Sequence, residues 1–486
     1  MLFNSYPFIF AFLPLTFFIY FYLNSKRLTE LSKGFLVFSS LFFYSWWNIA
    51  YLPLILCSML FNYIIGVSLS KKQEHKKVSK KTLLLIGISI NLLSLGYFKY
   101  SDFFISNINA MTTLHVELLH LALPLAISFF TFQQIAYIVD SYRGETKEYD
   151  FLNYALFVTF FPQLIAGPIV HHKEMMPQFA NIRNKTKNYK NIATGLFIFS
   201  IGLFKKVVIA DTFAIWANAG FDHSNVLSFF EAWATSLSYT FELYFDFSGY
   251  TDMAIGAALL FNIKLPINFN SPYKAKDIQD FWRRWHITLS RFLRDYIYIP
   301  LGGNRKGKFR TYYNLMVTFI LGGLWHGAGW TFVFWGSLHG VALVIHRLWK
   351  SFGFTMHRYL AWFITFNFVN IAWVFFRAKE WSEAKKVLWG MVGGNGVMVS
   401  DKTLYKLSFL RDFIASNPQN FGRLQFGTSA FVWSIVGIFV VARLQNSTDM
   451  ASRFSPSYKN LLFISAIIIY TMFDMNKISE FLYFNF

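Results

Sequence analysis

The sequence has few charged residues and almost no cysteine. Only 14% of its 486 residues are Asp, Glu, Lys or Arg, whereas 55% are hydrophobic. This leaves too little polar surface to cover a water-soluble globule of that size. The single cysteine, Cys57, excludes an intramolecular disulfide and any four-cysteine metal site. Its apolar surroundings predict an inert, packed thiol, and redox chemistry is not expected.

Long apolar stretches recur along the whole chain, many of them close to the ~20 residues that cross a bilayer as a helix. They lie near 8–23, 35–49, 51–70, 82–98, 118–139, 151–169, 191–210, 226–245, 250–262, 312–346, 358–376, 427–442 and 460–473. The segment 8–23 has no small-residue cleavage site after it, which predicts a retained span rather than a signal peptide. We expect an all-α polytopic membrane protein with about ten to twelve spans.

Basic residues outnumber acidic ones, giving a net charge of +20, but most of them stand in short segments between apolar ones. This placement indicates membrane orientation rather than nucleic-acid binding. Six lysines between Lys71 and Lys81 predict a cytoplasmic loop and an N-terminus outside the cell. Lys26, Arg27 and Lys33 then also lie inside. Arg443, Arg453 and Lys459 precede the final apolar run and predict that the C-terminus is outside too.

Some apolar runs contain helix-breaking residues. Pro162, Gly167 and Pro168 interrupt one run, and glycines at 322, 323, 327, 329 and 336 interrupt another. Such breaks are tolerated at membrane depth only inside protein or around a cavity, so half-length or re-entrant helices are expected. No repeat or low-complexity linker appears. We therefore expect one domain over 1–486, with core motifs in 120–376 and a C-terminal span and tail in 460–486.

Three carboxylates stand in an otherwise apolar stretch: Glu242, Asp246 and Asp252. Glu242 and Asp246 are four residues apart and would share a helix face. Uncompensated charge at membrane depth costs several kcal/mol. One interpretation is ion pairing with arginines elsewhere in the fold. The other is metal ligation, although no histidine spacing typical of a metal site accompanies them.

The segment 280–303 alternates aromatic and basic residues. Trp282, Trp285, Leu289, Phe292 and Tyr296 recur at three- and four-residue steps, and Arg283, Arg284, Arg291 and Arg294 occupy much of the rest. This pattern predicts an amphipathic helix at an interface. It would serve as a membrane-surface anchor, or its arginines would bind an anionic diphosphate such as that of coenzyme A. His286 is open between a catalytic residue and a headgroup contact.

His326 lies deep inside the apolar segment 312–346. A histidine there is either a hydrogen-bonded core residue or an intramembrane base, because its pKa lies near neutrality. The surrounding glycines suit a tightly enclosed site or simply close helix packing. His339 and His346 are expected to be interfacial.

Several blocks, in order, resemble the membrane-bound O-acyltransferase (MBOAT) family. Trp285-His286 about forty residues before Trp325-His326 is typical of that family. The blocks that begin at Pro124, Phe161, Tyr244 and Leu324 look like its bacterial polysaccharide branch, which includes the membrane subunits of alginate and peptidoglycan O-acetylation and of teichoic-acid D-alanylation. The resemblance covers most of the chain.

The resemblance implies a ring of helices with a central tunnel, His326 as the principal catalytic histidine and His286 as a second polar position. The chain ends Phe481-Leu-Tyr483-Phe-Asn-Phe486, which resembles the end of the partner peptide in teichoic-acid D-alanylation. There the tyrosine is the proposed acyl carrier. Tyr483 is therefore either a carrier or an aromatic interface anchor.

The resemblance further implies an O-acetyltransferase of the bacterial inner membrane. Acetyl-CoA would be the donor substrate, with no permanently bound cofactor and no metal. A periplasmic or membrane-anchored transferase would be the partner, alongside membrane lipids, and peptidoglycan the expected acceptor. The alternatives are alginate or another exopolysaccharide as acceptor, a lipid or protein acyltransferase, and a transporter or flippase, which broken helices and buried charges would also suit.

Overall fold

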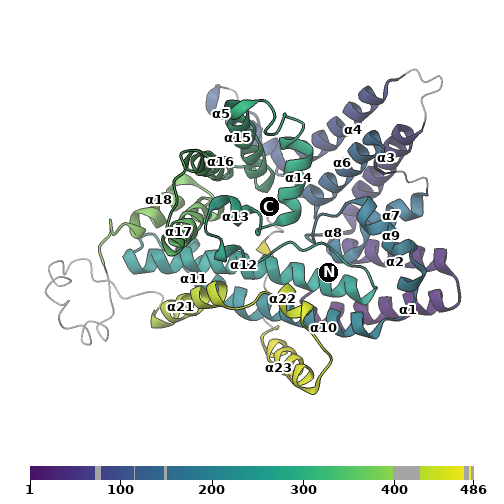
Figure 1. The fold of residues 1–486 in the computed structure, drawn as a ribbon. Coiled ribbons are helices and arrows are strands. Elements are labelled where there is room, and N and C mark those ends of the chain that lie inside the picture. The colour runs from purple at the N-terminus through teal and green to yellow at the C-terminus, as the bar shows by residue number, and fades with distance from the viewer. Residues whose placement is uncertain (72–77, 114, 147–149, 398–426, 476–480, 483–486) are drawn as a thin grey trace. The chain divides into compact units, whose positions relative to one another are not determined.

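The computed structural model describes residues 1–486 except 72–77, 114, 147–149, 398–426, 476–480 and 483–486. Every regular element in the described residues is a helix (Figure 1). The predicted all-α class is confirmed. Most of the six-lysine segment at 71–81 lies outside the described residues, as does Tyr483.

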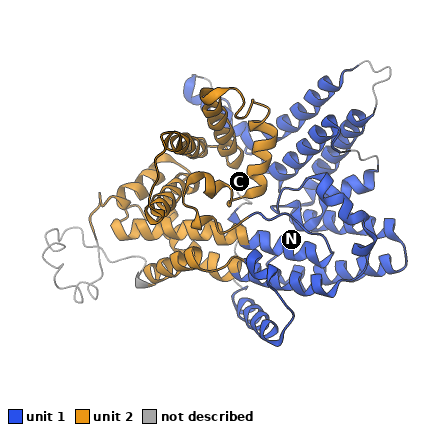
Figure 2. Cartoon of the chain, viewed as in Figure 1, with its two compact units in different colours: residues 1–204, 249–268, 447–486 blue, residues 205–248, 269–446 orange. Residues whose placement is uncertain are grey.

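The chain divides into two compact units (Figure 2), and each is described separately. Unit 1 comprises residues 1–204, 249–268 and 447–486. Its helices are η1 (Pro7–Phe12), α1 (Leu13–Ser25), α2 (Thr29–Ser45), η2 (Ile49–Tyr51), α3 (Leu52–Ser70), α4 (Lys80–Leu95), η3 (Gly96–Tyr100), α5 (Ser101–Met111), α6 (Ile127–Arg143), α7 (Phe151–Thr159), α8 (Phe161–Leu164), α9 (His172–Ala180), η4 (Ile182–Lys185), α10 (Tyr189–Phe204), α22 (Ser447–Ser452) and α23 (Tyr458–Asp474).

Unit 2 comprises residues 205–248 and 269–446. Its helices are η5 (Lys205–Ala210), α11 (Asp211–Asn218), η6 (Ala219–His223), η7 (Pro272–Lys274), α13 (Ile278–Trp282), α14 (Ile287–Leu293), η8 (Arg294–Tyr298), α15 (Gly307–His326), α16 (Trp330–Ser351), α17 (Arg358–Arg377), α18 (Trp381–Met391) and α21 (Gly427–Arg443). The boundary at 248/249 falls within α12 (Phe229–Leu260). The sequence suggested two apolar segments there, and the structure joins them into one helix. The single-domain expectation stays a prediction.

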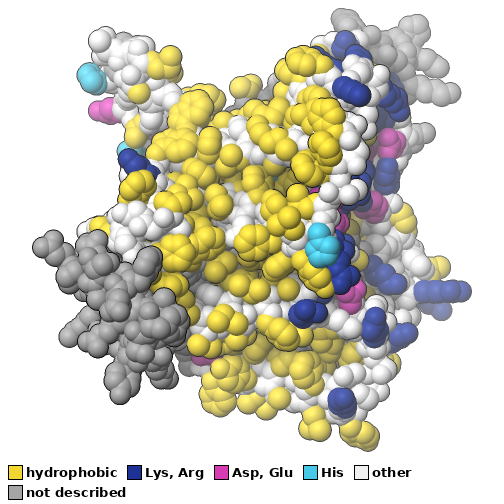
Figure 3. Space-filling model, turned by 60° about the vertical axis from the view of Figure 1, so that its left-hand side comes forward, with side chains coloured by type: hydrophobic (Ala, Val, Ile, Leu, Met, Phe, Trp, Pro, Cys, Tyr) yellow, Lys and Arg dark blue, Asp and Glu magenta, His cyan; other side chains and the backbone are white. Residues whose placement is uncertain are grey.

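Six helical stretches of the described chain are long and apolar enough to cross a membrane: Pro7–Ser25, Ile49–Ser70, Lys80–Met111, Tyr189–His223, Trp330–Ser351 and Arg358–Arg377. Shorter apolar helices such as α21 accompany them. On the face drawn in Figure 3, hydrophobic side chains cover most of the visible surface. Cys57, on α3, is exposed, so the predicted packed thiol is wrong. Cys57 lies on an outward-facing side of α3, where its apolar neighbours Leu56 and Leu60 are exposed too.

Both predicted helix interruptions are present. α7 ends at Thr159, α8 covers only Phe161–Leu164, and no helix follows until His172. In the second place, α15 ends at His326 and α16 begins at Trp330. Proline lacks a backbone donor and glycine is a poor helix former, so helices end where these residues gather.

The single amphipathic helix expected across 280–298 is wrong. The structure has two short helices, α13 and α14, separated by a turn at 283–286. His286 closes this turn in a left-handed conformation, with φ of 43°. The apolar side chains of the pattern nevertheless point inward, since Trp285 and Leu289 are both 1% exposed. The apolar side chains keep their three- and four-residue spacing across the turn, which is why the sequence suggested a single helix.

Candidate active site

The His326 side chain is the last of α15, and it is enclosed by aromatic rings. It is 3% exposed. Its ring centroid lies 4.8 Å from that of Trp325, 5.2 Å from that of Trp335 and 5.0 Å from that of Phe376. The Trp335 and Phe376 rings stand at 87° and 72° to the imidazole. Helices α15, α16 and α17 thus place three aromatic rings around the His326 imidazole.

Glycines let α15 and α16 approach closely beside this histidine. A Cβ on Gly323 would lie 2.3 Å from the Phe332 carbonyl oxygen, and one on Gly336 would lie 2.3 Å from that of Phe319. Both contacts are with backbone, which cannot swing away. The close-packing interpretation of the glycine-rich run is therefore confirmed, and the packing fixes the end of α15 that carries His326.

His286 lies near the same aromatic ring from another side. It is fully buried, and its centroid lies 4.8 Å from that of Phe247 and 6.3 Å from that of Trp325. Trp325 thus adjoins both imidazoles. Burial lowers the pKa of His286 to about 3, so its ring is neutral at physiological pH. The left-handed backbone of a non-glycine residue costs about 1–3 kcal/mol and is found at sites where the conformation serves function.

The four arginines near His286 are not equivalent. Arg283 is exposed and Arg291 is half-buried on α14. The Nε atom of Arg284 lies 2.8 Å from Asp280, and that of Arg294 lies 2.7 Å from Asp295. Two of the four predicted phosphate ligands, Arg284 and Arg294, are therefore paired with carboxylates.

Asp246, one of the three carboxylates that the sequence singled out on α12, is paired with a lysine, whereas one expectation was pairing with arginines. The Nζ atom of Lys206 lies 2.7 Å from Asp246 and 3.0 Å from Asp211. Lys206 is 3% exposed and was not among the residues singled out from the sequence. A lysine inside an apolar run, five residues before Asp211, was the available signal. Within the described residues, no cluster of three or more His, Cys, Asp or Glu could hold a metal ion.

His339 was expected to be interfacial, and this is wrong. It is fully buried on α16, and its Nδ1 accepts a hydrogen bond of 3.3 Å from Trp282 Nε1. Its ring also lies 4.8 Å from that of Trp335, which in turn packs against His326. His339 stands four residues after Trp335 and thus on the same helix face, a spacing that could have revealed it. His339 thus packs against Trp335, one of the rings that enclose His326.

Tyr483 lies outside the described residues, but the start of its motif does not. Phe481, in unit 1, is 2% exposed, and its ring stacks on that of Tyr250 with centroids 4.4 Å apart. The chain is therefore held inside unit 1 two residues before the tyrosine.

The chain is similar to known acyltransferases. The family described as membrane-bound O-acyltransferases matches residues 140–379, which include both histidines. The chain is 50% identical to the peptidoglycan O-acetyltransferase of Helicobacter pylori, over 100% of this chain and 98% of that protein.

More distant relatives carry other acyl-transfer names. The chain is 41% identical to a probable alginate O-acetylase of Pseudomonas putida, over 85% of this chain and 84% of the relative. It is also 30% identical to a teichoic acid D-alanyltransferase of Bacillus subtilis, over 52% of this chain and 69% of the relative. The chain therefore belongs to the membrane-bound O-acyltransferase family and is an O-acetyltransferase of its bacterial polysaccharide branch.

Proposed function

We propose that the protein moves acetyl groups from acetyl-CoA in the cytoplasm across the inner membrane, for O-acetylation of peptidoglycan by a periplasmic partner. The enclosure of His326 at the end of α15 is the observation that carries the proposal. A base surrounded by three aromatic rings is shielded from water, which would otherwise hydrolyse the acetyl ester. The extent of the likeness to a peptidoglycan O-acetyltransferase favours peptidoglycan over alginate as the final acceptor.

The chemical step uses His326 as general base. Its imidazole accepts the proton of an acceptor hydroxyl while the hydroxyl oxygen attacks the thioester carbonyl carbon. The tetrahedral intermediate collapses, the carbon–sulfur bond breaks, and the coenzyme A thiolate takes the proton from the imidazolium. One ester forms for each thioester consumed.

His286 is placed to orient rather than to exchange protons. A fully buried imidazole with a pKa of about 3 stays neutral, so one ring nitrogen can donate a hydrogen bond and the other can accept one. In this proposal His286 positions the thioester or the acceptor. Arg283, Arg284, Arg291 and Arg294 bind the donor phosphates, because guanidinium groups match phosphate oxygens in pairs.

Tyr483 is the proposed first acceptor. A phenol has an unperturbed pKa of about 10, so it requires a base, and a phenyl ester is reactive enough to pass its acetyl group on. Two observations support it: the C-terminal motif itself and the buried position of Phe481, two residues before the tyrosine. A periplasmic transferase would then take the acetyl group from the tyrosine to the glycan.

The test follows the label from acetyl-CoA. Purified protein in lipid nanodiscs is incubated with acetyl-CoA carrying a labelled acetyl group, and the protein, lipid and thiol products are analysed. We expect free coenzyme A and a labelled C-terminal peptide in the wild type, and neither in His326→Ala. His357→Ala, at an exposed histidine, is the matched control and should keep full transfer. Undiminished thiol release by well-folded His326→Ala would reject the proposed base.

A transporter is the second candidate, favoured by the broken helix at 160–171 and the buried charges around Lys206. It would move an acetylated compound without cleaving a thioester. Label that crosses a proteoliposome membrane with its thioester intact would favour transport and contradict acyl transfer.

A further inference from the structure

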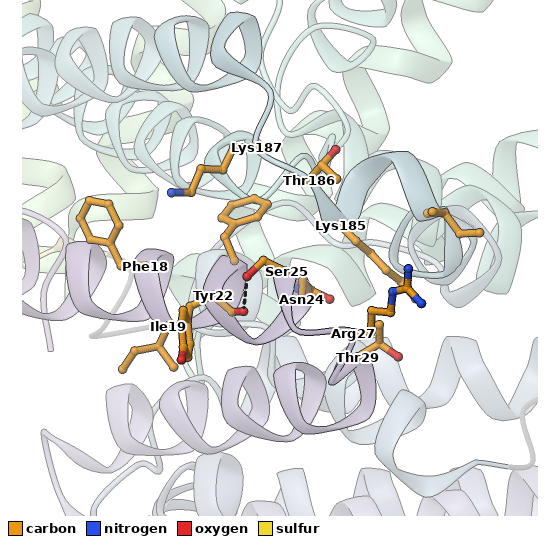
Figure 4. Close-up of a pocket in the computed structure, with 12 residues that line it drawn as sticks. Phe18, Ile19, Tyr22, Asn24, Ser25, Arg27, Thr29, Lys185, Thr186 and Lys187 are labelled. Carbon is orange, nitrogen blue, oxygen red and sulfur yellow. Dashed lines mark hydrogen bonds between the residues drawn. The ribbon is translucent and has the colours of Figure 1, made fainter.

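A cavity of about 960 Å³ lies in unit 1, between the end of α1 and the segment around η4. Figure 4 shows the residues that line it. Three of them are basic: Arg27, Lys185 and Lys187. Its volume is in the range of small-molecule sites, which is about 300–1,000 Å³. It contains neither histidine of the candidate active site.

The charge in this cavity is uncompensated. None of the described lining residues is Asp or Glu, and within the described part of the chain no carboxylate lies within salt-bridge distance of the three cations. Figure 4 shows Arg27, Lys185 and Lys187 among the side chains that line the cavity. Like charges in one cavity repel each other, and an anion bound there removes that cost. The cavity is thus complementary to a negatively charged group.

The remaining wall is apolar and open. Phe18, Ile19, Phe21, Tyr22 and Ile182 line it. Phe18 is 60% exposed and Tyr22 is 61% exposed, and Lys187 Nζ lies 5.5 Å from the Phe18 ring centroid. A soluble anion such as phosphate would contact the cations and leave these rings bare. A molecule with both an anionic head and hydrocarbon chains would cover both.

The backbone of Arg27 supports a role for its side chain. Arg27 lies in the turn between α1 and α2 with φ of 62°, a left-handed conformation that favours glycine. Its backbone N–H donates to the Asn24 carbonyl, which makes the turn tight. Glycine would fit this position without strain. The presence of an arginine there indicates that its guanidinium group has a role.

From these observations we propose that the cavity binds one anionic glycerophospholipid, with its phosphate on Arg27, Lys185 and Lys187 and its acyl chains along Phe18 and Tyr22. The position fits, because the cavity lies at the end of the candidate span Pro7–Ser25, where a headgroup sits. Arg27 is among the residues that the sequence assigns to the cytoplasmic side, whose lipid surface is anionic.

The test measures lipid retention by native mass spectrometry of protein in detergent, titrated with phosphatidylglycerol or phosphatidylcholine. The triple variant R27Q/K185Q/K187Q should bind phosphatidylglycerol about a hundredfold more weakly than the wild type, as expected for three cations at about fivefold each. The control K80Q/K81Q/K385Q removes the same charge elsewhere and should bind like the wild type. R27G, whose backbone suits the turn, should weaken binding without lowering the melting temperature.

Three outcomes would overturn the proposal. Equal retention of phosphatidylcholine and phosphatidylglycerol would show that charge does not select the ligand. Unchanged binding by the folded triple variant would place the lipid elsewhere. Displacement of the lipid by inorganic phosphate or coenzyme A at comparable concentration would assign the cavity to a soluble anion.

Discussion

Lys206 and Asp246 form an ion pair of 2.7 Å, with side chains that are only 4% and 1% exposed. Asp211 is the second carboxylate on the same ammonium group, at 3.0 Å. Taking charges out of water is costly, and the cost is offset only while each charge keeps its partners. The cluster therefore ties η5 and α11 to α12 through charge rather than through apolar packing.

The first prediction concerns this pair. Lys206→Met should lower the free energy of unfolding by about 3–5 kcal/mol, because it leaves Asp246 buried and uncompensated. The double variant K206M/D246N should recover part of that loss. Chemical unfolding in detergent micelles measures both. Lys173→Met, at a pair whose side chains are 47% and 40% exposed, should cost at most about 1 kcal/mol. Equal losses at the two lysines would contradict the buried pair.

The second prediction concerns the contact between α15 and α16. Gly336→Ala should destabilise the protein by about 1–3 kcal/mol and reduce acetyl transfer, since its Cβ would meet a backbone carbonyl and push α15 from its place. Gly323→Ala should act likewise. Gly34→Ala on α2 has no atom within 4 Å of the added Cβ and should be neutral or mildly stabilising. Thermal unfolding together with the transfer assay separates the effects, and harmless substitution at both 323 and 336 would reject the packing account.

The third prediction uses the left-handed backbone of His286. His286→Gly should be more stable than His286→Ala by about 1 kcal/mol, because only glycine adopts this conformation without strain. Both variants should lose acetyl transfer, since neither keeps the imidazole. A melting curve and the transfer assay test the two statements independently. Equal melting temperatures for His286→Ala and His286→Gly would show that the turn relaxes around the substitution. Full acetyl transfer by either variant would show that the positioning role is wrong.

The fourth prediction concerns the C-terminal tail. Tyr483→Phe keeps the ring and removes only the hydroxyl, so a carrier role predicts loss of labelled C-terminal peptide with unchanged melting. Phe481→Ala removes a buried ring from its stack on Tyr250 and should destabilise the protein by about 3–5 kcal/mol. Peptide mass spectrometry and thermal unfolding are the two measurements. Full acetyl transfer by Tyr483→Phe would assign the tyrosine to anchoring.

The sequence was sufficient to single out His326 as a candidate residue and to predict the helix break that follows it. Glycines 327 and 329 end α15 for local reasons, and local causes can be read from local residues. The partners of His326 could not be predicted, because Trp335 and Phe376 come from two other helices. Their approach depends on packing that only the folded chain reveals.

The segment 280–298 shows how periodicity can mislead. Trp285 and Leu289 keep a four-residue spacing across a turn, so the pattern suggested one helix where there are two.

Lys205 and Lys206 are neighbours in an apolar run, yet Lys206 is buried in ion pairs and Lys205 is half-buried. The lysine pair itself does not tell which of the two turns inward, and only Asp211, five residues after Lys206, points to it.

Consecutive residues of α12 connect the charge cluster to the site. Asp246 holds Lys206, and the next side chain, Phe247, stands edge-on to His286 with ring centroids 4.8 Å apart. The peptide unit between Asp246 and Phe247 therefore connects a buried ion pair to a ring that packs against His286, a candidate catalytic residue. We expect a substitution that removes the ion pair to displace Phe247 as well, and with it one of the rings that pack against His286.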